Sequence, residues 1–219
     1  YHDYSAEQLI DGIQKLVNVN LVSSKGKAYS SFSDLPKKAI YLYESNYSRH
    51  FYSNKLHDLN EDSFEVKVKG DNLFICGGSR GVIYGVYDIL EKFGNVRFYA
   101  SWMKVYPNSD KFEIPDKTSY SEKAAFAFRE QLFTQIAWDP DMASKFRANG
   151  GDSYITDTQG GRLYVYYGSY TGLLGTSKYP ISKYPEYYAL YEGKRSSNHV
   201  CLSNSKVFEI IRDNFIRSE

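Results

Sequence analysis

Three glycines stand where a phosphate-binding loop could form. The apolar residues 73–76 are followed by Gly77, Gly78 and Gly81, and a helical pattern begins directly after them. Backbone N–H groups of such a loop can cradle a phosphate at the start of a helix. The spacing could therefore serve a dinucleotide or a nucleoside triphosphate.

The fingerprint of a dinucleotide site is nevertheless incomplete. It needs a glycine where Cys76 stands, and Arg97 occupies the position from which an acidic residue would bind the ribose. It also belongs to a parallel βαβ unit, whereas the preceding hairpin is expected to be antiparallel. Gly77, Gly81 and Gly85 are spaced by four, so in a helix they would share one face and let it approach the sheet closely. We expect these glycines to serve packing, and we expect no cofactor.

Arg80 lies at the N-terminus of the same helix, where the helix dipole disfavours a positive charge. We therefore expect a carboxylate from another element to lie opposite Arg80. The resulting salt bridge would make this arginine a structural residue.

Other kinds of site find little support in the sequence. The histidines show no His-x-x-x-His spacing, so we expect no metal, and no Gly-x-Ser-x-Gly motif indicates a serine hydrolase. Cys76 and Cys201 lack metal-ligand spacing, and we expect both to be thiols.

The charges of the chain are balanced, which limits its partners. Lys and Arg number 27 against 26 for Asp and Glu, a net charge of +1, so we expect no nucleic acid partner. No apolar run approaches the roughly 18 residues of a membrane span, and no signal-peptide pattern opens the sequence. Since the sequence begins at Tyr1, we expect a leader or lipid anchor to have been removed.

Residues 1–122 alternate short strands with two helices. A capping box at residues 5–8 predicts a helix to about Val17, and residues 79–93 predict a second, which Gly94 would end as a left-handed cap. Strand patterns occur at residues 39–43, 64–68, 73–76, 96–99 and 111–114. A turn at residues 70–72 predicts an antiparallel hairpin. We expect an α+β N-terminal domain, with an antiparallel or mixed sheet and two helices on one face.

The pattern changes near Lys123. Residues 125–129 form a candidate strand, and Asp139 and Pro140 supply the cap and first residue of a helix that would end near Gly150. Residues 163–167 could be the next strand, and a loop without periodicity runs over residues 168–194. Ser203 or Ser205 would cap a final helix.

Several motifs occur together in an order typical of one group of proteins. "GGSRGVIYGVYDILEKFGNVRFYA", "EIP" and "AFAFRE" resemble the N-terminal accessory domain and first barrel strand of glycoside hydrolase families 20 and 67. The resemblance is closest to bacterial proteins with the domain of unknown function 4838, which "YPEYYALYEGKR" and "CLSNSKVFEII" also resemble. Ala125 departs from the usual proline, and Tyr179 or Tyr184 stands in place of a histidine.

The resemblance implies an accessory-like domain over residues 1–122 and the first βα units of an incomplete (β/α)8 barrel over residues 123–219. Such barrels need about 250 residues, and no residue here can be matched to the paired carboxylates of glycoside hydrolysis. We expect the N-terminal portion of an exported, periplasmic or extracellular glycoside hydrolase that acts on an N-acetylhexosaminide or a uronide. The chain itself is expected to be inactive.

Three residues are the candidates for substrate binding. Arg129 resembles the first-strand arginine that binds sugar hydroxyls in family 20; alternatively, it pairs with Glu130 or Asp139 and holds the first loop. Trp138 and Asp139 follow on that loop, where Trp138 could stack on a pyranose or pack against its neighbours. We expect the residues of the later motifs to belong to a solvated, charged loop: Tyr187, Lys194, Arg195 and His199.

Two alternative functions stay open. The aromatic content is high, with 22 Tyr, 13 Phe and 17% aromatic residues, and residues 164–191 could form a platform in a non-catalytic carbohydrate-binding or scaffold protein. A nucleotide-dependent enzyme that uses the Gly77 loop is the other alternative. Carbohydrate is the expected partner, and the remainder of the barrel or another copy of the chain would cover the exposed barrel edge.

Overall fold

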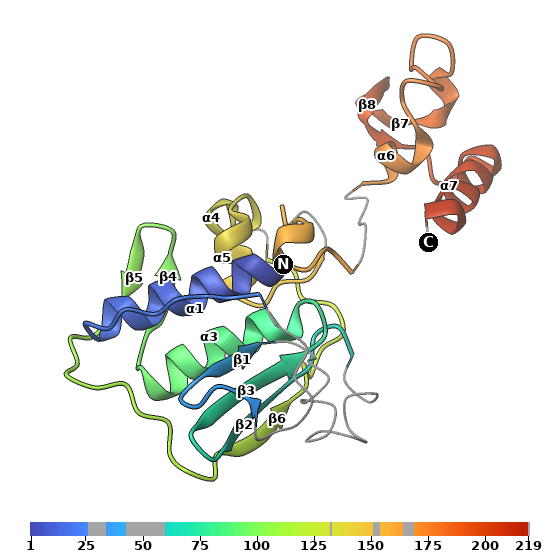
Figure 1. Ribbon diagram of the computed structural model, residues 1–219. Helices are drawn as coiled ribbons and strands as arrows, with labels where there is room; N and C mark the ends of the chain where they lie inside the picture. The colour runs from blue at the N-terminus through green and yellow to red at the C-terminus, as the bar shows by residue number, and fades with distance from the viewer. Residues whose placement is uncertain (26–33, 43–59, 132, 151–153, 164–168, 219) are drawn as a thin grey trace. The chain divides into compact units, whose positions relative to one another are not determined.

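The computed structural model describes residues 1–25, 34–42, 60–131, 133–150, 154–163 and 169–218 (Figure 1). These residues form two compact units, Tyr1–Leu163 and Tyr164–Glu219. The boundary at residue 122 that the resemblance implies stays a prediction.

Unit 1 is built on a small mixed sheet of four strands in the order β1-β3-β2-β6. The central strands β2 (Phe64–Lys69) and β3 (Asn72–Gly77) form the expected antiparallel hairpin. Strand β6 (Ser119–Glu122) pairs antiparallel with β2, whereas β1 (Ile40–Leu42) pairs parallel with β3. The parallel pairing makes the sheet mixed, one of the two forms that the sequence predicted.

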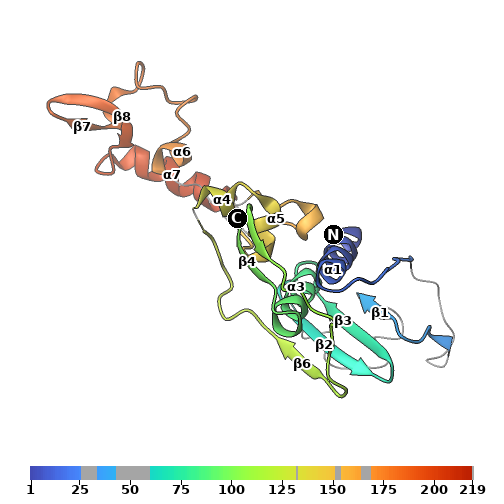
Figure 2. The same cartoon turned by 90° about the vertical axis from the view of Figure 1, so that its left-hand side faces the viewer.

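Two helices, α1 (His2–Leu16) and α3 (Gly81–Phe93), lie on the same side of this sheet (Figures 1 and 2). The stripe Leu9, Ile13 and Leu16 of α1 is buried, and so are the apolar residues of α3. Both stripes pack into one core with the inward residues of β2 and β3. Burial of these apolar faces holds the two layers together.

Local details of unit 1 differ from the expectations at three places. Helix α1 begins before the expected capping box. Ser5 lies inside the helix, and its hydroxyl donates to the Tyr1 carbonyl instead of capping the helix start. Gly94 has a φ of −95°, and Asn95 is the left-handed residue instead, with a φ of 51°. Residues 111–114 form no strand; Phe112 packs against the core from an extended segment.

A hairpin of β4 (Arg97–Ala100) and β5 (Met103–Val105) completes the sheet elements of unit 1. Beyond it come α4 (Thr134–Ala137), α5 (Pro140–Lys145) and the 3₁₀-helix η3 (Asp157–Gln159). Asp139 caps α5 as predicted, but the helix ends at Lys145, because Arg147 adopts a left-handed φ of 57°.

The strand expected at residues 125–129 is absent. The Asn149 side chain accepts from the Arg129 N–H and donates to the Ala127 carbonyl, and the Asn149 N–H donates to the Arg129 carbonyl. One asparagine thus satisfies backbone groups that a neighbouring strand would otherwise pair. The described residues between 123 and 163 contain no β-strand.

Unit 2 contains a hairpin of β7 (Tyr188–Tyr191) and β8 (Lys194–Val200), with α6 (Tyr170–Leu174), the 3₁₀-helix η4 (Pro185–Tyr187) and α7 (Ser205–Ser218). The loop expected over residues 168–194 is therefore wrong in part, and most of the candidate strand at residues 163–167 lies outside the described residues. The final helix is confirmed, but its cap is Asn204, whose side chain accepts from the N–H groups of Lys206 and Val207. The small core of unit 2 contains Leu174, Tyr188 and Ile211.

Candidate functional site

A buried carboxylate, Asp62, joins the sheet layer of unit 1 to the segment that carries the predicted site residues. Arg80 donates to it through Nε at 2.7 Å and Nη2 at 3.3 Å, and Arg129 donates from Nη2 at 2.9 Å. The Asn149 amide adds a fourth hydrogen bond at 3.3 Å. The carboxylate expected opposite Arg80 is thereby confirmed.

Two opposing effects set the pKa of Asp62. Burial raises the pKa, but the hydrogen bonds and positive charges of Arg80 and Arg129 outweigh burial, so it lies below the ordinary value. Tyr84 contacts the same cluster, and burial raises its pKa to about 12. The cluster therefore holds an ionised carboxylate between two guanidinium groups at neutral pH.

The glycine-rich loop beside this cluster has no free cradle for a phosphate. The Glu61 carbonyl accepts from the N–H groups of Arg80 and Gly81, and the Glu61 carboxylate accepts from the Ser79 N–H. The Gly78 N–H donates to the Ser63 carbonyl. A residue of the chain itself thus occupies the position in which a phosphate would accept these bonds.

Close packing explains the glycines instead. A Cβ atom on Gly81 would lie 1.9 Å from the Ser63 carbonyl oxygen, and one on Gly85 would lie 2.6 Å from the Ile75 side chain. Gly77 is the last residue of β3 rather than part of the helix, yet a Cβ there would lie 2.5 Å from the same Ser63 oxygen. The packing interpretation is confirmed.

Arg129 is held by a full set of protein partners. Besides Asp62, its Nε donates to the Arg147 carbonyl and its Nη1 to the Phe126 carbonyl, both at 2.7 Å. Arg129 forms an ion pair with Asp62, whereas the sequence suggested Glu130 or Asp139 as its partner. Three of its five N–H groups are therefore engaged in fastening the segment, and the other two have no hydrogen-bond partner among the described residues.

Trp138 and Asp139 lie on the turn between α4 and α5. The Asp139 Oδ1 atom accepts from the N–H groups of Asp141 and Met142, which fixes the turn, and Oδ2 makes no hydrogen bond with a described residue. The Trp138 side chain is 65% exposed. An exposed aromatic residue is thus followed directly in sequence by a carboxylate that caps a helix.

A second polar cluster lies under α5 and was not predicted. Lys145 donates to Asp141 at 2.6 Å and to Gln8 at 2.8 Å, and Asp141 accepts from the hydroxyl of Tyr4, which also contacts the Tyr87 hydroxyl at 2.8 Å. Burial raises the pKa of Asp141, but the hydrogen bond and the positive charge of Lys145 have the larger effect, so the pKa lies below its ordinary value. Burial lowers the pKa of Lys145. The cluster joins α5 to α1 and α3.

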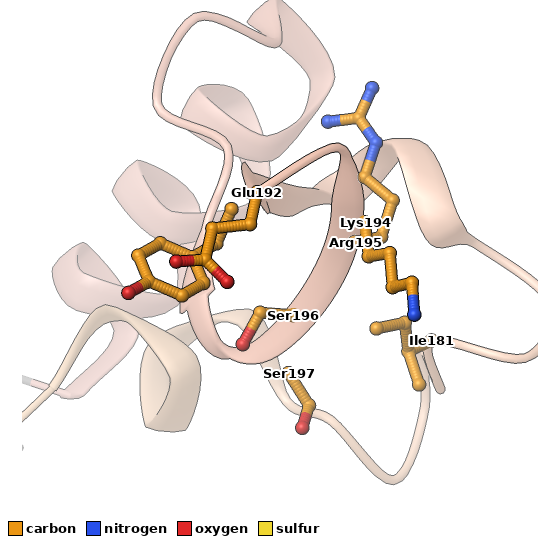
Figure 3. Close-up of a pocket in the computed structure, with 7 residues that line it drawn as sticks. Ile181, Glu192, Lys194, Arg195, Ser196 and Ser197 are labelled. Carbon is orange, nitrogen blue, oxygen red and sulfur yellow. The ribbon is translucent and has the colours of Figure 1, made fainter.

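Unit 2 carries a pocket of about 450 Å³, which we call the hairpin pocket (Figure 3). Figure 3 shows Glu192 on one side and Ile181 on the other. Lys194 and Arg195 of the later motifs belong to its lining, which consists of Ile181, Tyr191, Glu192, Lys194, Arg195, Ser196 and Ser197. His199 does not line it, although it is exposed on β8.

Tyr188 lies in the core of unit 2, and the other described tyrosines of this unit divide into two groups. Tyr179, Tyr184 and Tyr187 pack against one another, with ring centroids 5.2–5.7 Å apart. Tyr170 and Tyr191 are exposed. The segment expected to form a platform therefore contributes one packed cluster and two exposed rings among its described residues.

The described residues contain no group of three or more His, Cys, Asp or Glu that could hold a metal ion. In the same part of the chain, no helix is both long enough and apolar enough to cross a membrane.

The sequence singled out Arg80, Arg129 and the turn at Trp138 as candidates. It did not single out Asp62, which contacts both arginines, or Asn149, which contacts Arg129. A signal for Asp62 existed, since Arg80 required a carboxylate, but Glu61 and other acidic residues satisfied that requirement equally. No sequence signal marked the hairpin pocket as a cavity.

A family model described as "Domain of unknown function (DUF4838)" matches residues 98–218, which is more than half of the chain. The match covers the turn at Trp138, the Asn149 and Arg129 contacts and the hairpin pocket. No curated protein and no solved structure matches the chain.

Proposed function

Because the chain belongs to the DUF4838 family, we propose that it is a portion of a glycoside-hydrolase-like protein and that this portion binds a carbohydrate. The order of motifs shared with the accessory domains and barrels of glycoside hydrolase families 20 and 67 supports this relationship. An accessory-like domain followed by barrel βα units, in an exported protein, is part of the proposal.

The observation that carries the proposal is the exposed Trp138 side chain, which is followed directly in sequence by Asp139, whose carboxylate is held by the start of α5. A pyranose has an apolar C–H face that stacks on an indole, and a hydroxyl-rich rim that donates to carboxylate oxygens. Asp139 Oδ2 has no partner among the described residues, so it can accept from a sugar hydroxyl. We include Arg129 in the proposal as a donor to the sugar, because two of its five N–H groups have no hydrogen-bond partner among the described residues.

Binding of N-acetylglucosamine oligosaccharides by the 219-residue chain, measured by titration calorimetry, tests the proposal. Trp138→Ala should weaken binding at least about tenfold. Trp102→Ala is the control, because Trp102 is also exposed but lies on the β4–β5 turn, and it should leave binding unchanged. Sugar affinity that is equal in the two variants would contradict the proposal.

Asp139→Asn separates binding from folding. Asparagine caps a helix about as well as aspartate, so α5 should keep its start and the free energy of unfolding should change little. The affinity should fall, because the amide is a weaker acceptor than the carboxylate. An unchanged affinity would remove Asp139 from the sugar site.

The second candidate is a non-catalytic carbohydrate-binding protein that uses the aromatic residues of unit 2. The exposed rings of Tyr170 and Tyr191 favour it. Here Tyr170→Ala should weaken sugar binding while Trp138→Ala leaves it unchanged, the reverse of the first proposal.

A further inference from the structure

The hairpin pocket carries two opposite charges that are not paired with each other, and we propose that it binds a small zwitterion. Such a ligand has an ammonium group at one end and a carboxylate at the other, as an amino acid and a dipeptide do. The proposal concerns unit 2 alone. It does not rest on the proposed sugar site at Trp138, and either can fail without the other.

Glu192 and Lys194 supply the two charges. Both residues line the pocket, and neither side chain forms an ion pair or a hydrogen bond with another described residue. Figure 3 shows the Glu192 carboxylate on one side of the pocket and Lys194 on the side of Ile181. A ligand with a single charge is attracted by one of the two groups and repelled by the other, whereas a zwitterion pairs with both.

Arg195 does not disturb this balance of charge. Its Nη1 atom donates to the Tyr188 carbonyl at 2.8 Å, and Figure 3 shows its guanidinium pointing away from the pocket. The guanidinium is thus engaged by the backbone of the hairpin itself. Among the charged residues of the lining, Glu192 and Lys194 are therefore the two that meet a ligand.

The turn of the hairpin positions the two charged residues before any ligand arrives. Glu192 and Gly193 both have positive φ, 48° and 76°, as in the two-residue turns that match the twist of a hairpin. This turn pairs Tyr191 with Lys194 across the strands, which fixes the backbone on both sides of Glu192. A ligand therefore has to order two side chains but no backbone, which lowers the entropic cost of binding.

The remaining lining residues suit the other parts of such a ligand. Ser196 and Ser197 provide hydroxyl groups, which donate to a carboxylate and accept from an ammonium group or a peptide N–H. Tyr191 and Ile181 provide apolar surface for an aliphatic side chain. The volume of about 450 Å³ lies within the usual range of small-molecule pockets, about 300–1,000 Å³.

Titration of the isotope-labelled 219-residue chain, followed by amide chemical shifts in nuclear magnetic resonance, tests this assignment. Glycylleucine at millimolar concentration should shift the amides of residues 191–197. N-acetylglycylleucine lacks the ammonium group and glycylleucinamide lacks the carboxylate, so each should bind about fivefold more weakly. Absent shifts in this segment, or equal binding of the three compounds, would overturn the proposal.

Two further titrations define the ligand and keep the two proposals apart. Leucine, measured beside glycylleucine, distinguishes the sources of the zwitterion: tighter binding of leucine assigns the pocket to amino acids, and tighter binding of glycylleucine assigns it to dipeptides. Either result supports the proposal. Trp138→Ala removes the proposed sugar site and should leave the shifts of residues 191–197 unchanged, and their loss in this variant would contradict a site within unit 2.

Paired variants assign each charge to its end of the ligand. Lys194→Gln should weaken glycylleucine binding about fivefold and leave glycylleucinamide unchanged, because the amide has no carboxylate to pair with the lysine. Glu192→Gln should weaken glycylleucine equally and leave N-acetylglycylleucine no weaker. Lys183→Gln, at an exposed lysine of unit 2 outside the pocket, is the control and should bind like the wild type. Wild-type affinity for glycylleucine in Lys194→Gln or in Glu192→Gln would refute the proposal.

Discussion

The Nε atom of Arg80 lies 2.7 Å from Oδ1 of Asp62, and their side chains are only 4% and 8% exposed. The same oxygen accepts from Arg129 at 2.9 Å. One carboxylate therefore pairs with two guanidinium groups, one at the start of α3 and one in the segment that leads to Trp138, and the three groups keep one net positive charge. These two ion pairs, which share Asp62, fasten the segment before the proposed sugar-binding turn to the sheet layer.

Asp62→Ala should destabilise unit 1 by about 3–5 kcal/mol, because it leaves Arg80 buried without a counter-charge. Urea unfolding of the variant and the wild type measures the difference. Glu113→Gln is the control: it breaks the exposed pair with Lys111 and should change stability by less than about 0.5 kcal/mol. Similar losses in the two variants would contradict a special role for Asp62.

The Asp62 cluster shows how far sequence reasoning reaches. The misplaced charge of Arg80 predicted a carboxylate, because the helix dipole acts over one turn and can be read locally. The sequence does not identify Asp62 as that carboxylate, because the pairing depends on how the residues before β2 approach the start of α3. Asn149 is harder still, because its amide replaces a whole strand partner for residues 127–129.

The acid sensitivity of unit 1 should follow the carboxylates whose pKa values are lowered in the folded chain, among them Asp62 and Asp141. The folded-state pKa values of Asp62 and Asp141 lie below their ordinary values, as a net result of burial, which raises them, and of partner charges, which lower them more. The unfolded chain therefore binds more protons in acid, and the stability is complete above the unfolded pKa of about 3.9 and is lost as the pH falls through the folded values.

Urea unfolding between about pH 2 and pH 7 measures this dependence. The free energy of unfolding should be nearly constant above about pH 5 and should fall below about pH 4. Asp62→Asn should show a shallower fall, since it removes one of the carboxylates with a lowered pKa while Asp141 and Glu61 remain. A variant with the same acid dependence as the wild type would show that Asp62 does not titrate at a lowered pKa.

Gly81→Ala should destabilise unit 1 by about 3 kcal/mol or more, since its Cβ would lie 1.9 Å from backbone oxygen of Ser63 and neither backbone can move easily. Gly172→Ala is the matched control within a helix: its Cβ would meet nothing closer than 3.9 Å. It should leave unit 2 as stable, or raise its stability by up to about 1 kcal/mol. A tolerated Gly81→Ala would contradict the packing role of these glycines.

Nucleotides should not stabilise the chain. Millimolar NADP or ATP should leave its melting temperature unchanged, because the Glu61 carbonyl and carboxylate already accept from the N–H groups of the glycine-rich loop. A concentration-dependent rise would mean that the loop opens to bind phosphate, against the structure. Differential scanning fluorimetry makes the comparison directly.

The barrel was the part that local sequence could support least. Residues 125–129 alternate small and aromatic side chains, the pattern of a strand, yet Phe126 and Phe128 are exposed and the backbone pairs with Asn149. A strand exists only when a neighbour is in register with it, and that neighbour is not encoded in the segment itself. The hairpin of β2 and β3 was predictable because its partner and its turn adjoin it in sequence.

The dissociation constant of an N-acetylglucosamine oligosaccharide, measured by calorimetry for Trp138→Ala and for Trp102→Ala, tests the proposed function most directly. We predict that Trp102→Ala binds like the wild type and that Trp138→Ala binds at least about tenfold more weakly. Equal constants in the two variants, or no binding by the wild type, would contradict carbohydrate recognition at this turn.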